Sequence, residues 1–430
     1  MDVDLLLADA DHVIIGDGTA LERASVAIDA GRIVAVGTDL PHRAREVVDL
    51  RGHLLMPGLV NLHTHLPMTL LRGIAEEVDL QGFLERVWAE EARLMDPHGC
   101  RIGARLGALE SLLGGTTTAL DMYLHPEATH EGAVEVGLRH VIGPVFFSFP
   151  GPDGLTWDQR MASVDAWPQV LERIGGPHVP RYLMPHAAFT VEPAHLAELA
   201  ALAAERGYHV HTHCSENHRE NDDTIAFAGA RPVEVLDHAG ILARRPVLAH
   251  AVRLSESDRA TVAARGASVA HCPGSNLKLA SGAADIVGYR DDGILVGLGT
   301  DGCSSSNDLD MFAVMRLAAN LARLVSDDPA AISSRAIVRA ATLDGAVAIG
   351  LGDRIGSIEP GKEADLVALD LQAAHLVPLH DPHTAVVYAA GRSDVSDVWV
   401  AGEQVVRDRR PTRVDSAEVL ATAREWVARG

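Results

Sequence analysis

Lysine is almost missing from this sequence, and the positively charged residues are scattered along the chain. Lysine and arginine together number 37 against 59 acidic residues, only Lys278 and Lys362 are lysines, and the formal net charge is −22. No group of basic residues forms a stripe that could follow a line of phosphates. Nucleic acids and anionic membranes are therefore excluded as expected partners.

Cysteine is also scarce, and long apolar segments are missing. The four cysteines, Cys100, Cys214, Cys272 and Cys303, form no CxxC pair, which argues against a zinc knuckle or a disulfide framework. No apolar run approaches the ~18–20 residues of a membrane-spanning helix. The acidic N-terminus lacks the basic and apolar parts of a signal peptide, so we expect a cytoplasmic protein.

The two ends of the chain differ from its middle. Residues 1–57 and 355–430 are rich in short β-branched runs separated by turns, including a hairpin at 30–37, and a helix over 416–430 closes the chain. A chain of 430 residues, 47% of them hydrophobic, can bury one large core and a smaller one. We therefore predict that both ends join in one small β-domain.

In the middle of the chain, residues 58–354, short apolar strands alternate with helical patterns such as 96–115 and 192–207. This order predicts an α/β fold, either a (β/α)8 barrel or a doubly wound sheet. The eight predicted strands are 58–65, 116–123, 140–147, 181–189, 208–216, 246–252, 267–275 and 294–302.

Side chains able to do chemistry lie at the carboxyl ends of most of these strands. The carboxyl ends of barrel strands face one common mouth, whereas an open sheet spreads them along an edge, so this placement favours the barrel. The residues concerned are His63, His65, His186, His213, Glu216, His250, His271 and Asp301.

His63 and His65 are separated by one residue on the first predicted strand. Alternate side chains of a strand point to the same face, so both imidazoles can bind one metal ion. His213 and Asp301 would complete the ligand set, which suits Zn²⁺, with Fe²⁺ as the alternative. Asp301 could instead cap a helix that begins in residues 304–307. The fourth strand carries no lysine that could bridge two ions, so we expect a single metal.

Five segments, in this order, carry a resemblance to a known family: PGLVNLHTH, HCSE, AHAVRL, AHCPGSNLKLASG and GLGTDG. They resemble the amidohydrolase superfamily, and within it the branch of methylthioadenosine/S-adenosylhomocysteine deaminases and chlorohydrolase-like enzymes. The resemblance covers nearly the whole chain. It implies a distorted (β/α)8 TIM barrel over residues 58–354 beside a small β-sandwich domain built from 1–57 and 355–430.

Metal-binding and catalytic roles also follow from the resemblance. Glu216 would be the general acid and base, and His250 would orient the attacking water and the tetrahedral centre. Asp301 would accept the first proton of that water. Glu216 could instead be a surface residue of a polar loop. The four implied ligands of one divalent metal are His63, His65, His213 and Asp301.

The resemblance implies three substrate contacts as well. His186 would contact the substrate, and Glu91, with Glu90 as the fallback, would bind ribose hydroxyls. His186 could instead be a core histidine, and Glu91 could lie on a solvated helix face. Arg160, the only basic residue of the loop after the third strand, could receive a homocysteine carboxylate. Residues 122–130 offer no tryptophan to a purine, so S-adenosylhomocysteine is a weaker candidate than other nucleosides.

The sequence thus predicts a metal-dependent deaminase that releases ammonia from the 6-amino group of an adenine-type nucleoside: adenosine, 5′-deoxyadenosine, 5′-methylthioadenosine or a related compound. Another N-heterocycle is the alternative, namely guanine or 8-oxoguanine, cytosine, an s-triazine or a chlorinated ring. A non-catalytic scaffold is a third interpretation, which the full set of ligands opposes. The expected partner is this small heterocycle, and we expect a homo-oligomer, a dimer or a tetramer.

Overall fold

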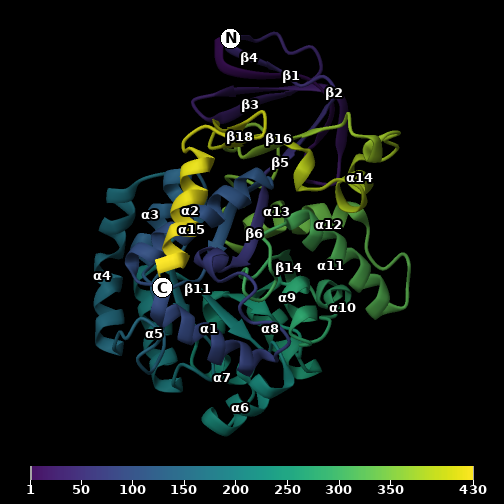
Figure 1. The fold of residues 1–430 in the computed structure, drawn as a ribbon. Helices are drawn as coiled ribbons and strands as arrows, with labels where there is room; N and C mark the ends of the chain where they lie inside the picture. The colour runs from purple at the N-terminus through teal and green to yellow at the C-terminus, as the bar shows by residue number, and fades with distance from the viewer. Residues whose placement is uncertain (1, 430) are drawn as a thin grey trace.

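The computed structural model of the protein describes residues 2–429, in which short parallel strands alternate with helices (Figure 1). Every strand pairing within the middle of the chain is parallel. A three-stranded sheet holds, in order, β6 (Leu59–Thr64), β7 (Thr116–Asp121) and β8 (Arg139–Val141). A six-stranded sheet holds, in order, β14 (Leu295–Leu298), β13 (Ser268–His271), β12 (Val247–His250), β11 (His209–Cys214), β10 (Tyr182–Pro185) and β9 (Val145–Phe146).

The two parallel sheets approach each other at both edges. At one edge, β8 and β9 are parts of one predicted strand that is interrupted at Gly143 and Pro144, where proline has no N–H to donate. At the other edge, the backbone N–H of Asp301 donates to the carbonyl of His63 at 3.0 Å. All eight predicted strands are present. The arrangement is an α/β fold consistent with a TIM barrel, as predicted.

Helices follow the strands as the sequence patterns indicated. The helix predicted over 96–115 begins after Asp96, whose side chain accepts the N–H of Gly99 at 2.8 Å, and it ends before Gly114. No helix among residues 2–429 is long and apolar enough to cross a membrane. The helices of this region are α1 (Leu80–Leu94), α2 (Pro97–Leu113), α3 (Pro126–Val136), α4 (Trp157–Ile174), α5 (Pro193–Arg206), α6 (His218–Ala228), α7 (Pro232–His238), α8 (Glu256–Arg265), α9 (Pro273–Lys278), α10 (Ile286–Asp291), α11 (Met311–Ser326), α12 (Ser334–Ala340) and α13 (Leu343–Ala348).

Strands from both ends of the chain form one nine-stranded sheet, which lies above the barrel strands in Figure 1. Antiparallel pairing of β5 with β15 joins the two ends. Alternate residues of these strands enter different apolar clusters: Leu54 and Met56 belong to the large core, whereas Leu55 belongs to a smaller core within the sheet region. The strands are β1 (Asp2–Ile14), β2 (Ala20–Asp29), β3 (Arg32–Gly37), β4 (Arg43–Asp49), β5 (His53–Pro57), β15 (Leu366–Asp370), β16 (Val395–Val400), β17 (Glu403–Arg407) and β18 (Arg410–Pro411).

The predicted hairpin at 30–37 is the β2–β3 turn. Ala30 and Gly31 both have positive φ angles, 47° and 74°, as a two-residue hairpin turn of this kind requires. A Cβ atom at Gly31 would lie 2.4 Å from the carbonyl oxygen of Ala401. Glycine is therefore needed here both for the turn and for the close approach of the C-terminal part of the sheet.

The closing helix α15 (Ser416–Arg429) lies against α2 rather than on the sheet (Figure 1). Arg105 of α2 forms an ion pair with Glu418 at 2.9 Å. The indole of Trp426 donates to the carbonyl of Leu94 at 3.0 Å. These two contacts hold the C-terminal helix against α1 and α2. A further helix, α14 (Pro382–Tyr388), lies between β15 and β16 in the sequence.

Candidate active site

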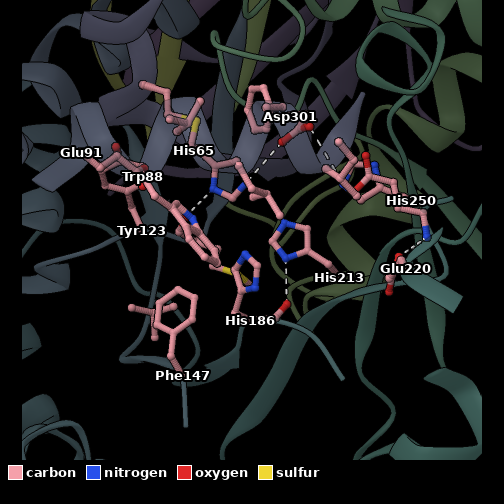
Figure 2. Close-up of a pocket in the computed structure, with 18 of the residues that line it drawn as sticks. His65, Trp88, Glu91, Tyr123, Phe147, His186, His213, Glu220, His250 and Asp301 are labelled. Carbon is pink, nitrogen blue, oxygen red and sulfur yellow. Dashed lines mark hydrogen bonds and ion pairs between the residues drawn. The ribbon is translucent and has the colours of Figure 1, made fainter. Parts of the chain in front are cut away.

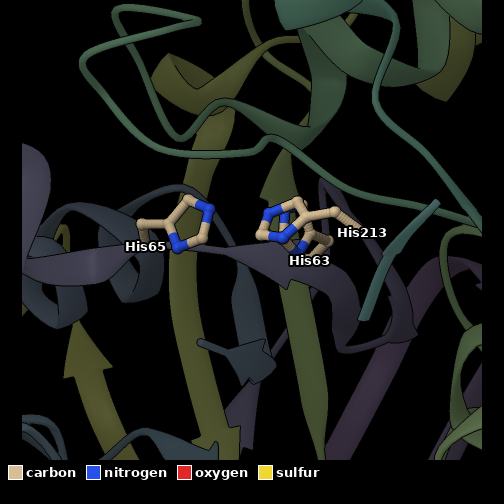
Figure 3. A group of neighbouring side chains, drawn as sticks. All are labelled: His63, His65 and His213. Atoms are coloured by element: carbon tan, nitrogen blue, oxygen red, sulfur yellow. The ribbon is translucent and has the colours of Figure 1, made fainter. Parts of the chain in front are cut away.

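Three histidines and an aspartate converge at the carboxyl ends of β6, β11 and β14. The Nε2 atoms of His63 and His65 lie 3.3 and 3.2 Å from the same carboxylate oxygen, Oδ1 of Asp301. The rings of His63 and His213 have centroids 4.9 Å apart. Figure 3 shows the three imidazoles turned toward one another. The structure therefore brings together all four of the predicted metal ligands.

Each of these histidines uses Nδ1 for a hydrogen bond and keeps Nε2 free. Nδ1 of His65 lies 2.5 Å from the carbonyl oxygen of Met122, and Nδ1 of His213 lies 2.8 Å from that of His186. A carbonyl can only accept, so both Nδ1 atoms carry a proton, and in the neutral rings that metal binding requires each Nε2 presents its lone pair. Nδ1 of His63 instead lies 2.8 Å from a ring nitrogen of His211.

The donor set fits a divalent cation. Nε2 of His63 is buried and has no hydrogen-bond partner, which is costly for a polar atom unless something else binds it. The ligand atoms of His63, His65 and His213 lie within 4.8 Å of one another, as do those of His63, His250 and Asp301. Three imidazoles and a carboxylate are characteristic ligands of Zn²⁺.

The charges of these groups follow from burial and from Asp301. Burial lowers the pKa of His63 to about 4 and that of His213 well below its usual value, so both rings are neutral, as metal ligands must be. Burial also acts on His65, but the Asp301 carboxylate outweighs it and raises the pKa of His65 to about 9. Burial opposes ionisation of Asp301, yet the two histidines hold its pKa well below the usual range.

Three non-glycine residues at these strand ends have a strained backbone. Asp301, His250 and Ser215 have φ angles of 62°, 71° and 51°, in the left-handed region that non-glycine residues rarely adopt. Such conformations cost roughly 1–3 kcal/mol each and persist where the surrounding structure imposes them, commonly at active sites. Residues after β11, β12 and β14 are thus held in orientations that a relaxed strand end would not give.

Asp301 is fixed by short hydrogen bonds. Oδ1 accepts the N–H of Gly302 and Oδ2 accepts the hydroxyl of Ser305, both at 2.8 Å. The alternative that Asp301 caps a helix is wrong: the structure has turns at 303–306, and the next helix, α11, is capped by Asp310.

Glu216 and His250 lie beside the metal-ligand group and are buried. Oε2 of Glu216 lies 3.6 Å from Nε2 of His250, which lies 4.0 Å from Oδ2 of Asp301. Nδ1 of His250 lies 2.9 Å from Oδ1 of Asn276. Burial raises the pKa of Glu216, although His250 opposes this shift. Glu216 is only 4% exposed, so the alternative of a solvated loop residue is wrong.

The opposite wall of the pocket is apolar and aromatic and comes mainly from α1 and from the ends of β9 and β10. The space between the lining side chains, with the open mouth included, is about 760 Å³. His186 lies against Phe147, with centroids 4.8 Å apart, and against Trp88, at 6.2 Å. Figure 2 shows Trp88, Phe147 and Glu91 on the side of the pocket away from His250.

Glu91, and not its neighbour Glu90, lines this pocket. Glu91 is 5% exposed, and burial raises its pKa to about 7, although the nearby Tyr123 opposes the shift. Glu90 forms a half-exposed ion pair with Arg93 at 2.5 Å on the outside of α1. The alternative of a solvated Glu91 is therefore wrong.

Arg160 does not join the other predicted residues. Its guanidinium is buried and donates to Asp153 at 2.5 Å and to the carbonyl of Val145 at 3.2 Å. It lies 5.0 Å from the ring centroid of Phe147 and is not a lining residue of the pocket. The structure thus gives no support to the prediction that Arg160 contacts substrate, because Asp153 already neutralises its charge.

Several lining residues were not predicted, although the sequence carried signals for some of them. Trp88 precedes Glu91 by three positions and so shares its helix face. His211, which contacts His63 but does not line the pocket, precedes His213 by two positions, the same spacing as His63 and His65. Glu220, Tyr123 and Phe147 also line the pocket. Their signals were weak, because loop and helix geometry decides where such side chains point.

Comparison with known proteins places this site in a family. The model of the amidohydrolase family matches residues 54–405. The chain belongs to the amidohydrolase family. Among curated relatives, a 5-methylthioadenosine/S-adenosylhomocysteine deaminase from Teredinibacter turnerae is 40% identical over 90% of this chain and 87% of its own length. A protein of the same name from Syntrophobacter fumaroxidans is 36% identical over 99% and 98%.

Solved structures of other amidohydrolases share the fold. A zinc-bound adenosine deaminase from Xanthomonas campestris is 38% identical, with a TM-score of 0.94 over 100% of this chain and 98% of that one. Atrazine chlorohydrolase from Arthrobacter aurescens, complexed with zinc, is 28% identical, with a TM-score of 0.90 over 98% and 100%. This amidohydrolase therefore resembles structures that bind zinc, and it has a His/Asp group that could hold a metal ion. The predicted family and branch are confirmed.

Proposed function

We propose that this amidohydrolase is a zinc-dependent hydrolytic deaminase that releases ammonia from the 6-amino group of an adenine nucleoside. The observation that carries the proposal is the pocket itself. One wall presents the His/Asp ligand group with Glu216 and His250, and the other presents aromatic rings and the buried Glu91. The names of the relatives support deamination of adenine nucleosides as the reaction.

Zinc would be bound by His63, His65, His213 and Asp301, as one ion per subunit. The nitrogen-rich donor set supports Zn²⁺ over Mg²⁺ or Ca²⁺, which prefer oxygen ligands. The zinc bound in the related structures supports Zn²⁺ rather than Fe²⁺. Elemental analysis of the purified protein would distinguish the two metals.

The reaction adds water to the ring carbon that carries the amino group and expels ammonia. A divalent cation in this site would lower the pKa of the attacking water. Asp301 faces the metal-ligand group and can accept the first proton. Glu216, whose pKa is raised by burial, can protonate the ring nitrogen beside the attacked carbon and then pass a proton to the leaving amine. Nε2 of His250, between Glu216 and Asp301, can bind the oxygen added to the ring.

The aromatic wall would hold the rest of the nucleoside. Trp88 and Phe147 offer faces for flat or apolar groups. The Thr190 hydroxyl donates to the carbonyl of Ala187 and lies 3.0 Å from Nδ1 of His186. Nδ1 of His186 therefore donates to that hydroxyl, and Nε2 is free to accept a hydrogen bond from substrate. Glu91, when ionised, would accept hydrogen bonds from ribose hydroxyls.

The charges of the pocket support a nucleoside whose 5′ group is uncharged. The residues that line the pocket include no arginine or lysine, whereas Glu91, Glu216, Glu220 and Asp301 are all acidic. A carboxylate on the 5′ group would have no positive partner, since Arg160 is paired with Asp153. We therefore propose 5′-methylthioadenosine, 5′-deoxyadenosine and adenosine as better substrates than S-adenosylhomocysteine.

A panel assay of ammonia release tests this proposal. The compounds are adenosine, 5′-deoxyadenosine, 5′-methylthioadenosine, S-adenosylhomocysteine, guanine, cytosine and an s-triazine. We expect the highest kcat/KM for the nucleosides with uncharged 5′ groups. Rapid turnover of a free base or a triazine, with none of any nucleoside, would overturn the proposal in favour of the other heterocycles.

For the fold, we propose that residues 58–354 form a closed, distorted (β/α)8 barrel and that 1–57 with 355–430 form a β-sandwich domain. The separate apolar cluster within the terminal regions supports this division, and α15 would then be an arm of that domain that contacts the barrel. We also propose a homo-oligomer, testable by light scattering. A cytoplasmic location, in keeping with four free cysteine thiols, is testable by cell fractionation.

A further inference from the structure

The three metal-binding histidines differ in what holds their second ring nitrogen. For His65 and His213 the partner is a main-chain carbonyl, which no substitution of a side chain can remove. For His63 the partner is a side chain, because its Nδ1 lies 2.8 Å from Nε2 of His211. His211 lies on β11, two residues before His213. In a hydrogen bond between two imidazoles, one ring donates and the other accepts. Which of the two rings donates decides whether His63 can bind a cation.

The carbonyl of Val247 sets this direction. Nδ1 of His211 lies 2.9 Å from that oxygen, on the neighbouring strand β12. The oxygen can only accept, so Nδ1 of His211 carries a proton, and Nε2 of a neutral ring is then an acceptor. Nδ1 of His63 must therefore donate to it. The proton of His63 is thus on Nδ1, and its Nε2 presents a lone pair to the site.

If His211 donated this hydrogen bond and His63 accepted it, His63 could not bind a metal ion. If His211 carried a second proton, its Nε2 would donate to Nδ1 of His63, and the proton of His63 would lie on Nε2. That nitrogen could then bind no cation. Both rings are fully buried, at 0% exposure, and a buried charge without a partner is unfavourable. The described surroundings of His211 give its ring a carbonyl and another imidazole as bonded partners, but no carboxylate.

We infer that His211 is a positioning residue for the metal site. It accepts the Nδ1 proton of His63, is itself anchored by the Val247 carbonyl, and so fixes the tautomer in which Nε2 of His63 binds the metal. This inference rests on the proposed function only in that the site holds a divalent cation. It does not depend on which heterocycle the enzyme deaminates.

Two polar substitutions separate the two hydrogen bonds of His211. In His211→Asn the amide lies near the position of Nδ1, so it can donate to Val247 but offers no acceptor to His63. In His211→Gln the longer amide reaches the position of Nε2, and its oxygen can accept the proton of His63. His383→Leu is a matched control, because His383 is equally buried, lies on α14, and makes no side-chain hydrogen bond.

The measurement is the affinity of the metal-free protein for Zn²⁺ alone, by competition with a chelator and without substrate. We expect His211→Asn to bind Zn²⁺ ~10–100-fold more weakly, which is typical when a partner of a metal-ligating histidine is removed. His211→Gln and His383→Leu should bind it nearly as well as the unchanged protein. The visible spectrum of the Co²⁺-loaded protein should change in His211→Asn and stay the same in His211→Gln.

Two results would overturn the inference: unchanged Zn²⁺ affinity in a folded His211→Asn, or equal weakening in a folded His211→Gln. If His211→Asn does not fold, weaker Zn²⁺ binding by a folded His211→Gln still overturns the inference, since this variant keeps an acceptor for the proton of His63. Failure of the proposed function is distinguishable from both, because it would be seen as the absence of nucleoside deamination in a protein that binds zinc normally.

Discussion

The two walls of the pocket are built in different ways. The strand-end wall, comprising His63, His65, His213, His250 and Asp301, comes from buried strands, and each of its side chains is fixed by hydrogen bonds. The helix wall, comprising Trp88, Glu91, Phe147 and His186, comes from α1 and strand-following loops and relies on ring contacts. The difference supports our proposal that the strand-end wall carries out the reaction, whereas the helix wall selects the substrate.

Removal of a metal ligand should have the largest effect. For His63→Ala we expect zinc content and kcat to fall together, with a loss of activity of ~10³-fold or more, because several kcal/mol of transition-state stabilisation depend on the metal. Elemental analysis and an ammonia assay measure the two quantities. Normal turnover in a zinc-free variant would show that the strand-end wall does not act through a metal.

Glu216→Gln should separate metal binding from proton transfer. The variant keeps the size of the side chain and leaves the four ligands in place, so zinc content should stay normal. The loss of a general acid and base should lower kcat by ~10²–10⁴-fold. If kcat stays near that of the unchanged protein, the proton is moved by another group.

Glu91→Gln tests the helix wall, with Glu90→Gln as its matched control on the outer face of the same helix. Loss of hydrogen bonds to a charged group should raise KM for nucleosides about 10-fold or more, with little change in kcat. Glu90→Gln should change neither. An effect on kcat as large as that of Glu216→Gln would place Glu91 in the reaction rather than in selection.

The pH dependence of KM gives a second test of Glu91. Its pKa is raised to about 7 by burial, so the carboxylate that we propose to bind ribose hydroxyls is present above this pH and is lost as the pH falls through it. KM for adenosine should therefore rise below pH 7 in the unchanged protein. In Glu91→Gln this rise should be missing, and its persistence would assign the titration to another group.

Arg160→Met should have the smallest effect on selection. Arg160 is paired with Asp153 behind Phe147 and outside the pocket. We expect altered packing to lower kcat/KM somewhat for both 5′-methylthioadenosine and S-adenosylhomocysteine. The ratio of the two kcat/KM values should stay constant. A selective loss of S-adenosylhomocysteine would mean that the guanidinium reaches its carboxylate.

The same two walls explain what the sequence could predict. The eight strands and the convergence of His63 and Asp301 were predicted because strand alternation and the common mouth of a barrel are local and topological rules. Strand ends were placed one to four residues too late, because pattern alone does not mark positive-φ residues such as His250, with which β12 ends.

The helix wall was predicted less well, for a physical reason. Glu91 was assigned only through the family resemblance, and Trp88 was not assigned at all, because the orientation of α1 depends on tertiary packing. Arg160 lies on α4 and not in the expected loop, and its buried pairing with Asp153, seven residues earlier, could not be read from spacing. The role of His211 required the hydrogen bond to Val247 on the next strand, a contact known only from the fold.

The most direct test of the central claim is the activity of the metal-free protein. Ammonia release from 5′-methylthioadenosine should be abolished after exhaustive chelation and should return in proportion to added Zn²⁺, with one ion per chain at saturation. A chelated protein that retains its full rate would contradict the account. The reaction would then not need a metal ion bound by His63, His65, His213 and Asp301.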